Sequence, residues 1–164
     1  LLLLSQLLHS KQVSGVRLAA LSGAGFEAVG MADNIQSDDF TLRMADISQQ
    51  TKQKIRGLMT RKQLDKLVNI KNPLDINPGA DDEVHVETVR LLAEDSHVDA
   101  VVVGLDPLSP AMRTLSECKA GRYDFNDPSS IAMTLPALLR GLRKPVVGVV
   151  DVGDGAAVGG EARD

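Results

Sequence analysis

The chain has 164 residues, of which 43% are hydrophobic and 24% are charged, and its formal net charge is -4. This length and apolar content build one compact domain, which excludes a disordered or fibrous protein and falls short of a complete multi-domain enzyme. Aromatic residues make up only 2% of the chain and there is no Trp. Because base stacking needs aromatic rings and the charge balance is acidic, we expect no nucleic-acid partner.

The cysteine content and the amino-terminal stretch indicate a cytoplasmic protein. Cys118 is the single cysteine, so it forms no internal disulfide, and no clustered His/Cys spacing predicts a metal site. The Leu-rich residues 1–8 are too few to span a bilayer and lack the basic region of a signal peptide, so no membrane partner is expected. We interpret residues 1–14 as the end of a leading helix and a linker, and the chain as a piece of a longer polypeptide.

From residue 15 onward, short apolar runs alternate with amphipathic stretches, a pattern typical of βα units. In chain order we predict a strand at 16–21, a helix at 26–35, a weaker strand at 40–45, a helix at 49–59, an extended segment at 73–76, a helix at 82–94 with acids at its start, a strand at 100–105, a helix at 128–142 that Pro136 permits to break, and a strand at 146–150.

These elements predict an α/β fold over residues 15–150, a three-layer open parallel sheet of the flavodoxin-like or Rossmann-like kind with helices on both faces. The Gly-rich residues 151–164 do not have the composition of a packed helix. We interpret them as a disordered tail or as a truncated final unit.

The strongest candidate site is the turn formed by Ser22, Gly23, Ala24 and Gly25. It joins a buried strand directly to a helix, where backbone N–H groups and the helix dipole converge on an anion. The turn is therefore a candidate phosphate site, although glycines also serve tight βα turns alone. Glu27 places a carboxylate close to where the phosphate would lie.

The same glycines permit a second interpretation as a dinucleotide-binding fingerprint. Gly23 and Gly25 are followed by Ala28 in the G-x-G-x-x-A pattern, and Asp46 lies about 20 residues further on, where a ribose-binding acid is expected. An NAD- or NADP-binding module is therefore an alternative. A non-catalytic interaction domain that docks through its Leu-rich start is another.

Two further loops follow predicted strands and contain polar side chains. Because ligands bind at the carboxyl ends of parallel strands, we expect these side chains to line a crevice. The candidates are Asn72, Asp75, Asn77, Gly79 and Asp106.

No residue of the chain is a convincing catalytic group. We interpret His9, His85 and His97 as surface helix residues because no nucleophile motif accompanies them. The basic run between residues 52 and 71 is interpreted as a solvated surface.

Several segments, taken in order, resemble the NDP-forming acyl-CoA synthetases, which are relatives of succinyl-CoA synthetase. The similar segments are residues 16–25, the helix ending Met31-Ala32-Asp33, the turn Asn72-Pro73-Leu74-Asp75, and residues 92–103. The resemblance covers residues 16–150. It implies the flavodoxin-like domain that corresponds to the carboxyl-terminal domain of the succinyl-CoA synthetase beta subunit.

The resemblance also implies a function. These enzymes convert an acyl-CoA, a nucleoside diphosphate and phosphate into an acid, CoA and a nucleoside triphosphate through a phosphorylated histidine on a mobile loop. In this chain the role of stabilising the phosphohistidine falls on the turn Ser22, Gly23, Ala24 and Gly25. The resemblance implies that ATP or ADP, Mg²⁺ and CoA bind to nucleotide-grasp and CoA-binding partner domains or subunits, that no cofactor is held tightly here, and that the chain is not catalytic alone. The sequence leaves open whether the chain also forms a homo-oligomer.

Overall fold

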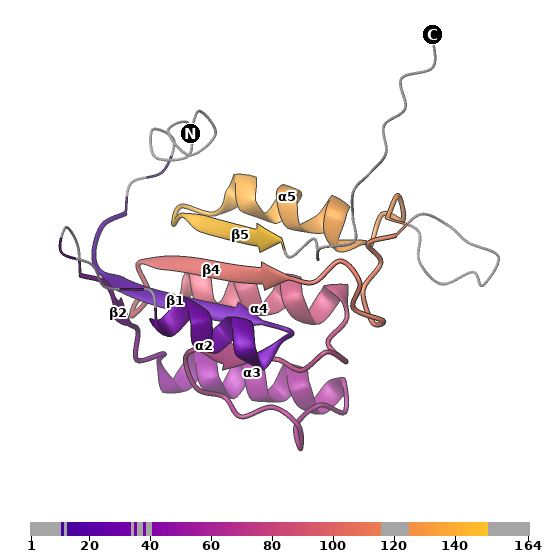
Figure 1. Cartoon of the computed structure of the whole chain (residues 1–164), viewed down its shortest axis with the longest axis horizontal. Coiled ribbons are helices and arrows are strands. Elements are labelled where there is room, and N and C mark those ends of the chain that lie inside the picture. Colours follow the sequence, from indigo (N-terminus) through magenta and orange to yellow (C-terminus); the bar gives the residue numbers. More distant parts are fainter. Residues whose placement is uncertain are drawn as a thin grey trace, which may run out of the picture.

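A computed structural model describes residues 11, 13–33, 35, 38, 41–115 and 125–150, which form one open α/β sheet with its helices (Figure 1). The strands are β1 (Arg17–Ser22), β2 (Arg43–Met44), β3 (Leu74–Asp75), β4 (Ala100–Leu105) and β5 (Val146–Val150). The helices are α2 (Gly25–Asp33), α3 (Gln49–Arg61), α4 (Asp82–Glu94) and α5 (Ile131–Gly141). The predictions for residues 1–10 and 151–164, and those for His9 and Cys118, lie outside the described residues.

All strand pairs of the sheet are parallel, as predicted, and β1 lies near its centre. One side of β1 pairs with two short strands, with β2 at its start and with β3 at its end. The other side pairs with β4, which pairs in turn with β5. If β2 and β3 are counted as one position, the order is 2-1-3-4, as in flavodoxin-like folds. The order reverses between β1 and β4, which is where such sheets bind ligands.

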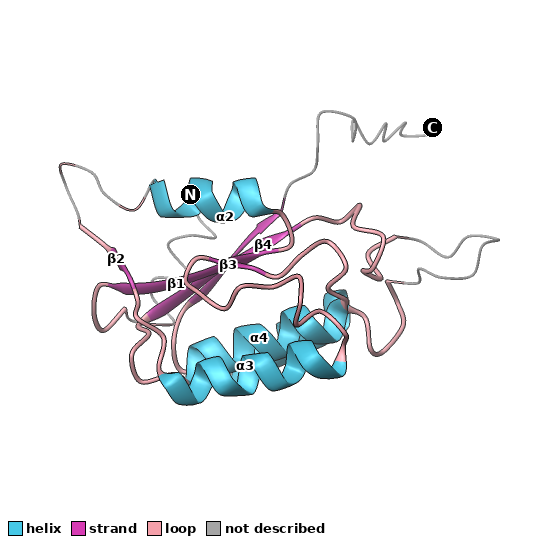
Figure 2. Ribbon diagram, turned by 90° about the horizontal axis from the view of Figure 1, so that it is seen from below, coloured by secondary structure: helices cyan, strands magenta, loops and turns pink. Residues whose placement is uncertain are grey.

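Helices cover both faces of the sheet, so the predicted three-layer arrangement is confirmed. Figure 2 shows α2 on one face and α3 and α4 on the other. Helix α5 packs beside α4, because its Ile131 and Leu135 belong to the same core cluster as Val101 and Val146. By contrast α2 buries only Ala28, so nearly all of the core lies on the α3 and α4 side.

Polar side chains define where the helices begin. Helix α4 has its predicted bounds, and the N-cap residue Asp81 accepts a hydrogen bond from Val84 N at 3.0 Å. The break that Pro136 permits does not occur, because α5 is one helix. Both Pro136 and Ala132, whose carbonyl loses its donor, are exposed, so water can satisfy that carbonyl. Helix α5 also begins at 131 rather than 128, since residues 125–130 form turns.

Within the described part of the chain, no helix is both long enough and apolar enough to cross a membrane. The predicted strand at 40–45 is confirmed only over Arg43–Met44.

Candidate functional site

Three loops meet at the carboxyl-terminal edge of the sheet. Ser22, the last residue of β1, lies opposite Asp75 of β3 and opposite Gly104 of β4. Ile76 N also donates a hydrogen bond to Ser22 O at 3.0 Å. The register thus brings the Gly-rich turn, the loop after β3 and the loop after β4, which begins at Asp106, to one edge. This is the convergence that the sequence predicts for parallel strands.

The Gly-rich turn already holds a carboxylate of its own. Ser22 is buried, and its Oγ accepts a hydrogen bond from Ala24 N at 3.0 Å while donating one to Glu27 Oε2. Helix α2 begins at Gly25, so Glu27 lies in its first turn. A helix N-terminus favours negative charge, and here Glu27 supplies it. Glu27 therefore points toward the turn and not away from it.

Two glycines at this edge are required by close approaches. A Cβ on Gly25 would lie 2.6 Å from Asp75 Oδ2, and a Cβ on Gly104 would lie 2.5 Å from Glu27 Oε2. A Cβ on Gly23, by contrast, would make only an ordinary contact of 3.6 Å. The carboxylate of Asp75 thus packs directly against the backbone of Gly25, and that of Glu27 packs against the backbone of Gly104.

The other predicted crevice residues mostly shape their own loops. Asp75 Oδ1 accepts from Asn77 N at 3.0 Å, and Asn77 Oδ1 accepts from Gly79 N at 2.9 Å. Asn77 has a left-handed backbone with φ 71°, which asparagine tolerates in turns. Asp106 Oδ1 accepts from Leu108 N at 2.8 Å. Only Asp75 also directs a carboxylate oxygen at the Gly-rich turn.

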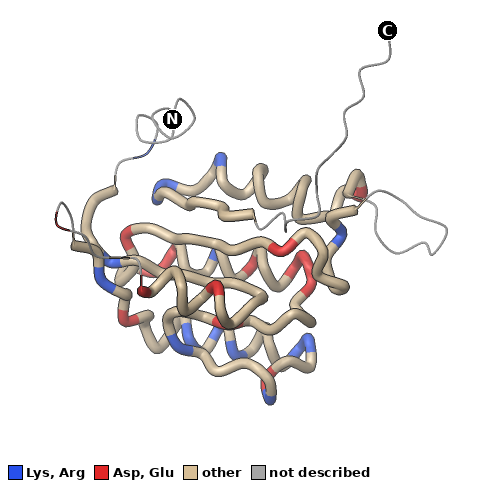
Figure 3. Tube along the Cα trace, viewed as in Figure 1, with Lys and Arg blue, Asp and Glu red and all other residues tan. Residues whose placement is uncertain are grey.

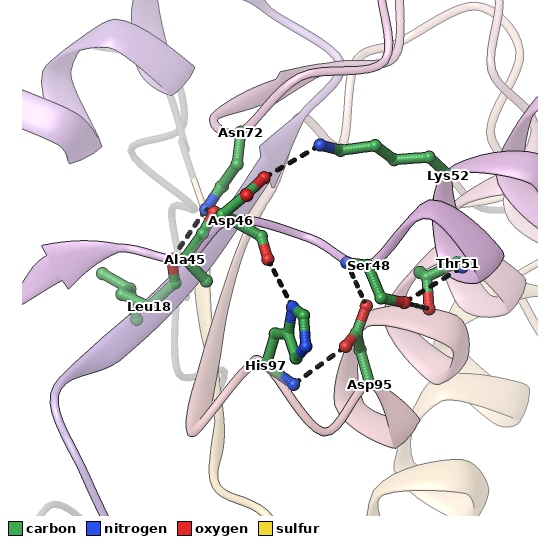
Figure 4. A network of polar contacts seen from close by, with 9 residues as sticks. All are labelled: Leu18, Ala45, Asp46, Ser48, Thr51, Lys52, Asn72, Asp95 and His97. Carbon is green, nitrogen blue, oxygen red and sulfur yellow. Dashed lines mark hydrogen bonds and ion pairs between the residues drawn. The ribbon is translucent and has the colours of Figure 1, made fainter.

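Asn72 is not among the crevice side chains. Its Nδ2 donates to Leu18 O at 2.8 Å and to Ala45 O at 3.0 Å, and its Oδ1 accepts from Ala20 N at 2.9 Å. Figure 4 shows the side chain between β1 and the segment that follows β2. Asn72 thus replaces strand pairing at the point where β2 has ended and β3 has not yet begun, which is a structural role.

Asp46 does not join the Gly-rich turn. Its main-chain oxygen accepts from His97 Nδ1 at 3.0 Å, and its carboxylate pairs with Lys52 at 2.9 Å, a hydrogen bond that lowers the pKa of Asp46 (Figure 4). Asp46 lines a surface depression together with Arg17, which is the first residue of β1. The Gly-rich turn lies at the other end of β1, after its last residue, Ser22. The acid and the glycines of the dinucleotide pattern are therefore apart. The reason is that β2 has only two residues and pairs with the start of β1.

The interpretation of His85 as a surface residue is wrong. Its side chain is 2% exposed, and burial lowers its pKa, so the imidazole is neutral at pH 7. Its Nδ1 lies 3.0 Å from Asp81 O. Because a carbonyl only accepts, Nδ1 carries the proton and Nε2 is left as an acceptor beneath Gly23. The stripe of buried residues at 85, 89 and 92 is the helical spacing that places His85 inward. His97 is exposed, but it lies in a turn rather than in a helix.

A polar depression of about 410 Å³ lies at the start of α4, and its charges are paired internally. Lys62 Nζ lies 2.8 Å from Asp81 and 2.6 Å from Glu83, and hydrogen bonds to both carboxylates raise its pKa. The buried Asp82 accepts from the backbone N–H groups of Arg113 and Ile131. Asp82 thus connects α4 to the loop after β4 and to α5.

No group of three or more His, Cys, Asp or Glu side chains that could hold a metal ion occurs in the part of the chain that the structure describes. The charges at the carboxyl-terminal edge are hydrogen-bonded carboxylates, and the nearby imidazole is buried. At this edge, small residues surround a helix N-terminus, and the carboxylate of Glu27 occupies the position of an anion. The arrangement is suited to holding an anion.

The fold defined above is a flavodoxin-like doubly wound domain, and solved structures share it. The PH0766 protein of Pyrococcus horikoshii superposes with a TM-score of 0.66 at 20% sequence identity, over 91% of this chain and 30% of that chain. The apo form of the dinucleotide forming acetyl-coenzyme A synthetase 1 of Candidatus Korarchaeum cryptofilum superposes with a TM-score of 0.67 at 19% sequence identity, over 92% of this chain and 29% of that chain.

The same synthetase in complex with phosphate and ADP gives a TM-score of 0.64 and 19% identity, over 92% of this chain and 28% of that chain. No family model matches the sequence, and the search of curated proteins finds no match. The chain therefore has the fold of a segment of these larger proteins and spans about 30% of the length of its structural neighbours.

Proposed function

We propose that this chain is one domain of an NDP-forming acyl-CoA synthetase and that its Gly-rich turn stabilises a phosphoryl group during turnover. The observation that carries the proposal is the turn itself, where Ser22 and the first residues of α2 hold a carboxylate at the switch point of the sheet. An environment that stabilises one anion has the hydrogen bonds and the dipole that another anion needs.

The mechanism assigned to this chain involves no covalent step. A phosphoryl group, free or on a histidine from a partner domain, lies at the N-terminus of α2 and replaces Glu27 as the acceptor of the Ser22 hydroxyl. Preorganised N–H and O–H donors stabilise developing charge without proton transfer. The nucleotide, Mg²⁺ and CoA are held by the partner domains, in agreement with the sequence resemblance and with the greater length of the structural neighbours.

The turn is tested by phosphate binding. Glu27→Gln keeps an acceptor for the Ser22 hydroxyl but removes the negative charge, so thermal stabilisation by inorganic phosphate should increase relative to the unaltered chain. Ser22→Ala removes the hydroxyl and should weaken the thermal stabilisation by inorganic phosphate. Glu94→Gln, at the far end of α4, is the matched control and should behave like the unaltered chain. If none of these proteins is stabilised by phosphate, the proposed role of the turn is refuted.

The enzyme is tested by reconstitution. The isolated chain should have no ligase activity. Joined to a nucleotide-grasp domain and a CoA-binding domain, it should give ATP consumption that depends on both acid and CoA. An assembly whose activity is unchanged when this domain is deleted would contradict the proposal.

A further inference from the structure

An apolar groove of about 340 Å³ lies on the α2 side of the sheet, beside the helix. It runs over the amino-terminal halves of β1, β4 and β5, and its apolar lining includes Val13, Val16, Leu18, Ala100, Val102 and Val147. The two charged lining residues direct their charges elsewhere. Lys11 donates to Leu139 O, and Arg17 pairs with Asp99 at 2.7 Å.

This part of the sheet is left open, because no residue of α2 lines the groove. In the register, Val102 lies opposite Val147, and both residues line the groove. Val147 is 43% exposed and Val149 48%, whereas Val146, on the opposite face, is 5% exposed. Figure 3 shows no charged residue along β5. A contiguous apolar face of this kind is stabilised when a second apolar surface covers it.

The described part of the chain reaches the rim of the groove a few residues after an apolar segment of the sequence. Lys11 and Val13 line it, and the eight residues at the start of the sequence include six leucines. Ten residues in a helix extend about 15 Å, close to the roughly 20 Å of a six-residue strand such as β4. With helical spacing, Leu1, Leu4 and Leu8 fall on one face.

We propose that the Leu-rich segment, residues 1–8, packs its leucines into this groove and covers the α2 side of β4 and β5. The segment then completes the sheet from its amino-terminal side, as an additional helix would do in an open α/β fold. This inference does not depend on the proposed function. It concerns the face of the sheet at the amino-terminal half of the strands, whereas the Gly-rich turn lies at their carboxyl-terminal edge.

The test compares the full 164-residue chain with a variant lacking residues 1–10 and with the double variant Leu4→Ser/Leu8→Ser. Both variants should bind the dye ANS more strongly and should lose roughly 4 °C or more in Tm, while far-UV circular dichroism remains that of a folded protein. Leu67→Ser, which alters an exposed leucine after α3, is the matched control and should leave both readouts unchanged.

A second change confirms the location. Val147→Ser should lower the Tm of the full chain but have little further effect once residues 1–10 are removed, because the two changes then disrupt one contact. Unchanged ANS binding and Tm in both amino-terminal variants would overturn the proposal. So would a dimer of the full chain, seen by sedimentation and abolished by Val147→Asp, because a second copy would then occupy the groove.

Discussion

Asn72 provides a sharp test of whether the loop before β3 is structural. Asn72→Ala removes three hydrogen bonds, those with Leu18 O, Ala20 N and Ala45 O, which lie at 2.8 to 3.0 Å. Each contributes about 0.5–1.5 kcal/mol net, so the substitution should lower the free energy of unfolding by about 3 kcal/mol. Urea denaturation followed by circular dichroism measures this loss directly.

Two controls separate the three hydrogen bonds from general effects on the loop. Asn72→Asp keeps the acceptor for Ala20 N but puts a carboxylate against two carbonyl oxygens, so it should be no more stable than Asn72→Ala. Asn69→Ala changes an exposed asparagine of the same loop and should alter stability by less than about 0.5 kcal/mol. Phosphate binding by the folded fraction should be unchanged in all three variants. The reasoning is refuted if Asn72→Ala is as stable as Asn69→Ala.

Three further changes in stability are expected, each measured by urea denaturation. Gly30→Ala should add about 0.5–1 kcal/mol, because a Cβ at this position in α2 meets open space. Gly25→Ala should cost about 1 kcal/mol, because its Cβ displaces the carboxylate of Asp75. Equal effects of the two substitutions would contradict the close approach of Asp75 to Gly25. Thr88→Val should add about 1 kcal/mol, because the buried hydroxyl has no hydrogen-bond partner among the described residues, and a loss would show that it has one. Hydrogen bonds from the side chain and backbone of Arg17 lower the pKa of Asp99 to about 2. The stability that they contribute is therefore present above pH 4 and lost as the pH falls toward 2. Asp99→Asn should remove this dependence, and an unfolding free energy that falls with pH as steeply as in the unaltered chain would contradict the assignment.

The sequence predicted those elements whose local signals agree with their tertiary surroundings. Helix α4 has an acidic N-cap and an apolar stripe, and both of its ends fall where the pattern places them. Strands β4 and β5 are unbroken apolar runs between turns, and their bounds are also as predicted. Strand β2 is different, because the side chain of Asn72 and the ring of His97 hold the segment that follows it, and no local pattern encodes those contacts.

At the candidate site, the sequence predicted which loops converge but not how their side chains are used. Parallel strands bring the loops after β1, β3 and β4 together, whichever residues they contain. The bond from Ser22 to Glu27 and the packing of Asp75 against Gly25 depend on spacings that only the folded backbone sets. The inward position of His85 follows from its helical spacing to the buried Val89 and Leu92, a signal that residue type alone does not carry.

The division of one edge position between β2 and β3 makes the two edges of the sheet unequal. A two-residue strand offers too few free backbone groups to template another chain, and short edge strands are one way in which proteins avoid aggregation. The opposite edge, β5, is a continuous run of five residues, four of them valines, and within the described residues it pairs only with β4. Within the described part of the chain, β5 is therefore the edge with enough free backbone groups to pair with a strand of another molecule, and the edge formed by β2 and β3 is not.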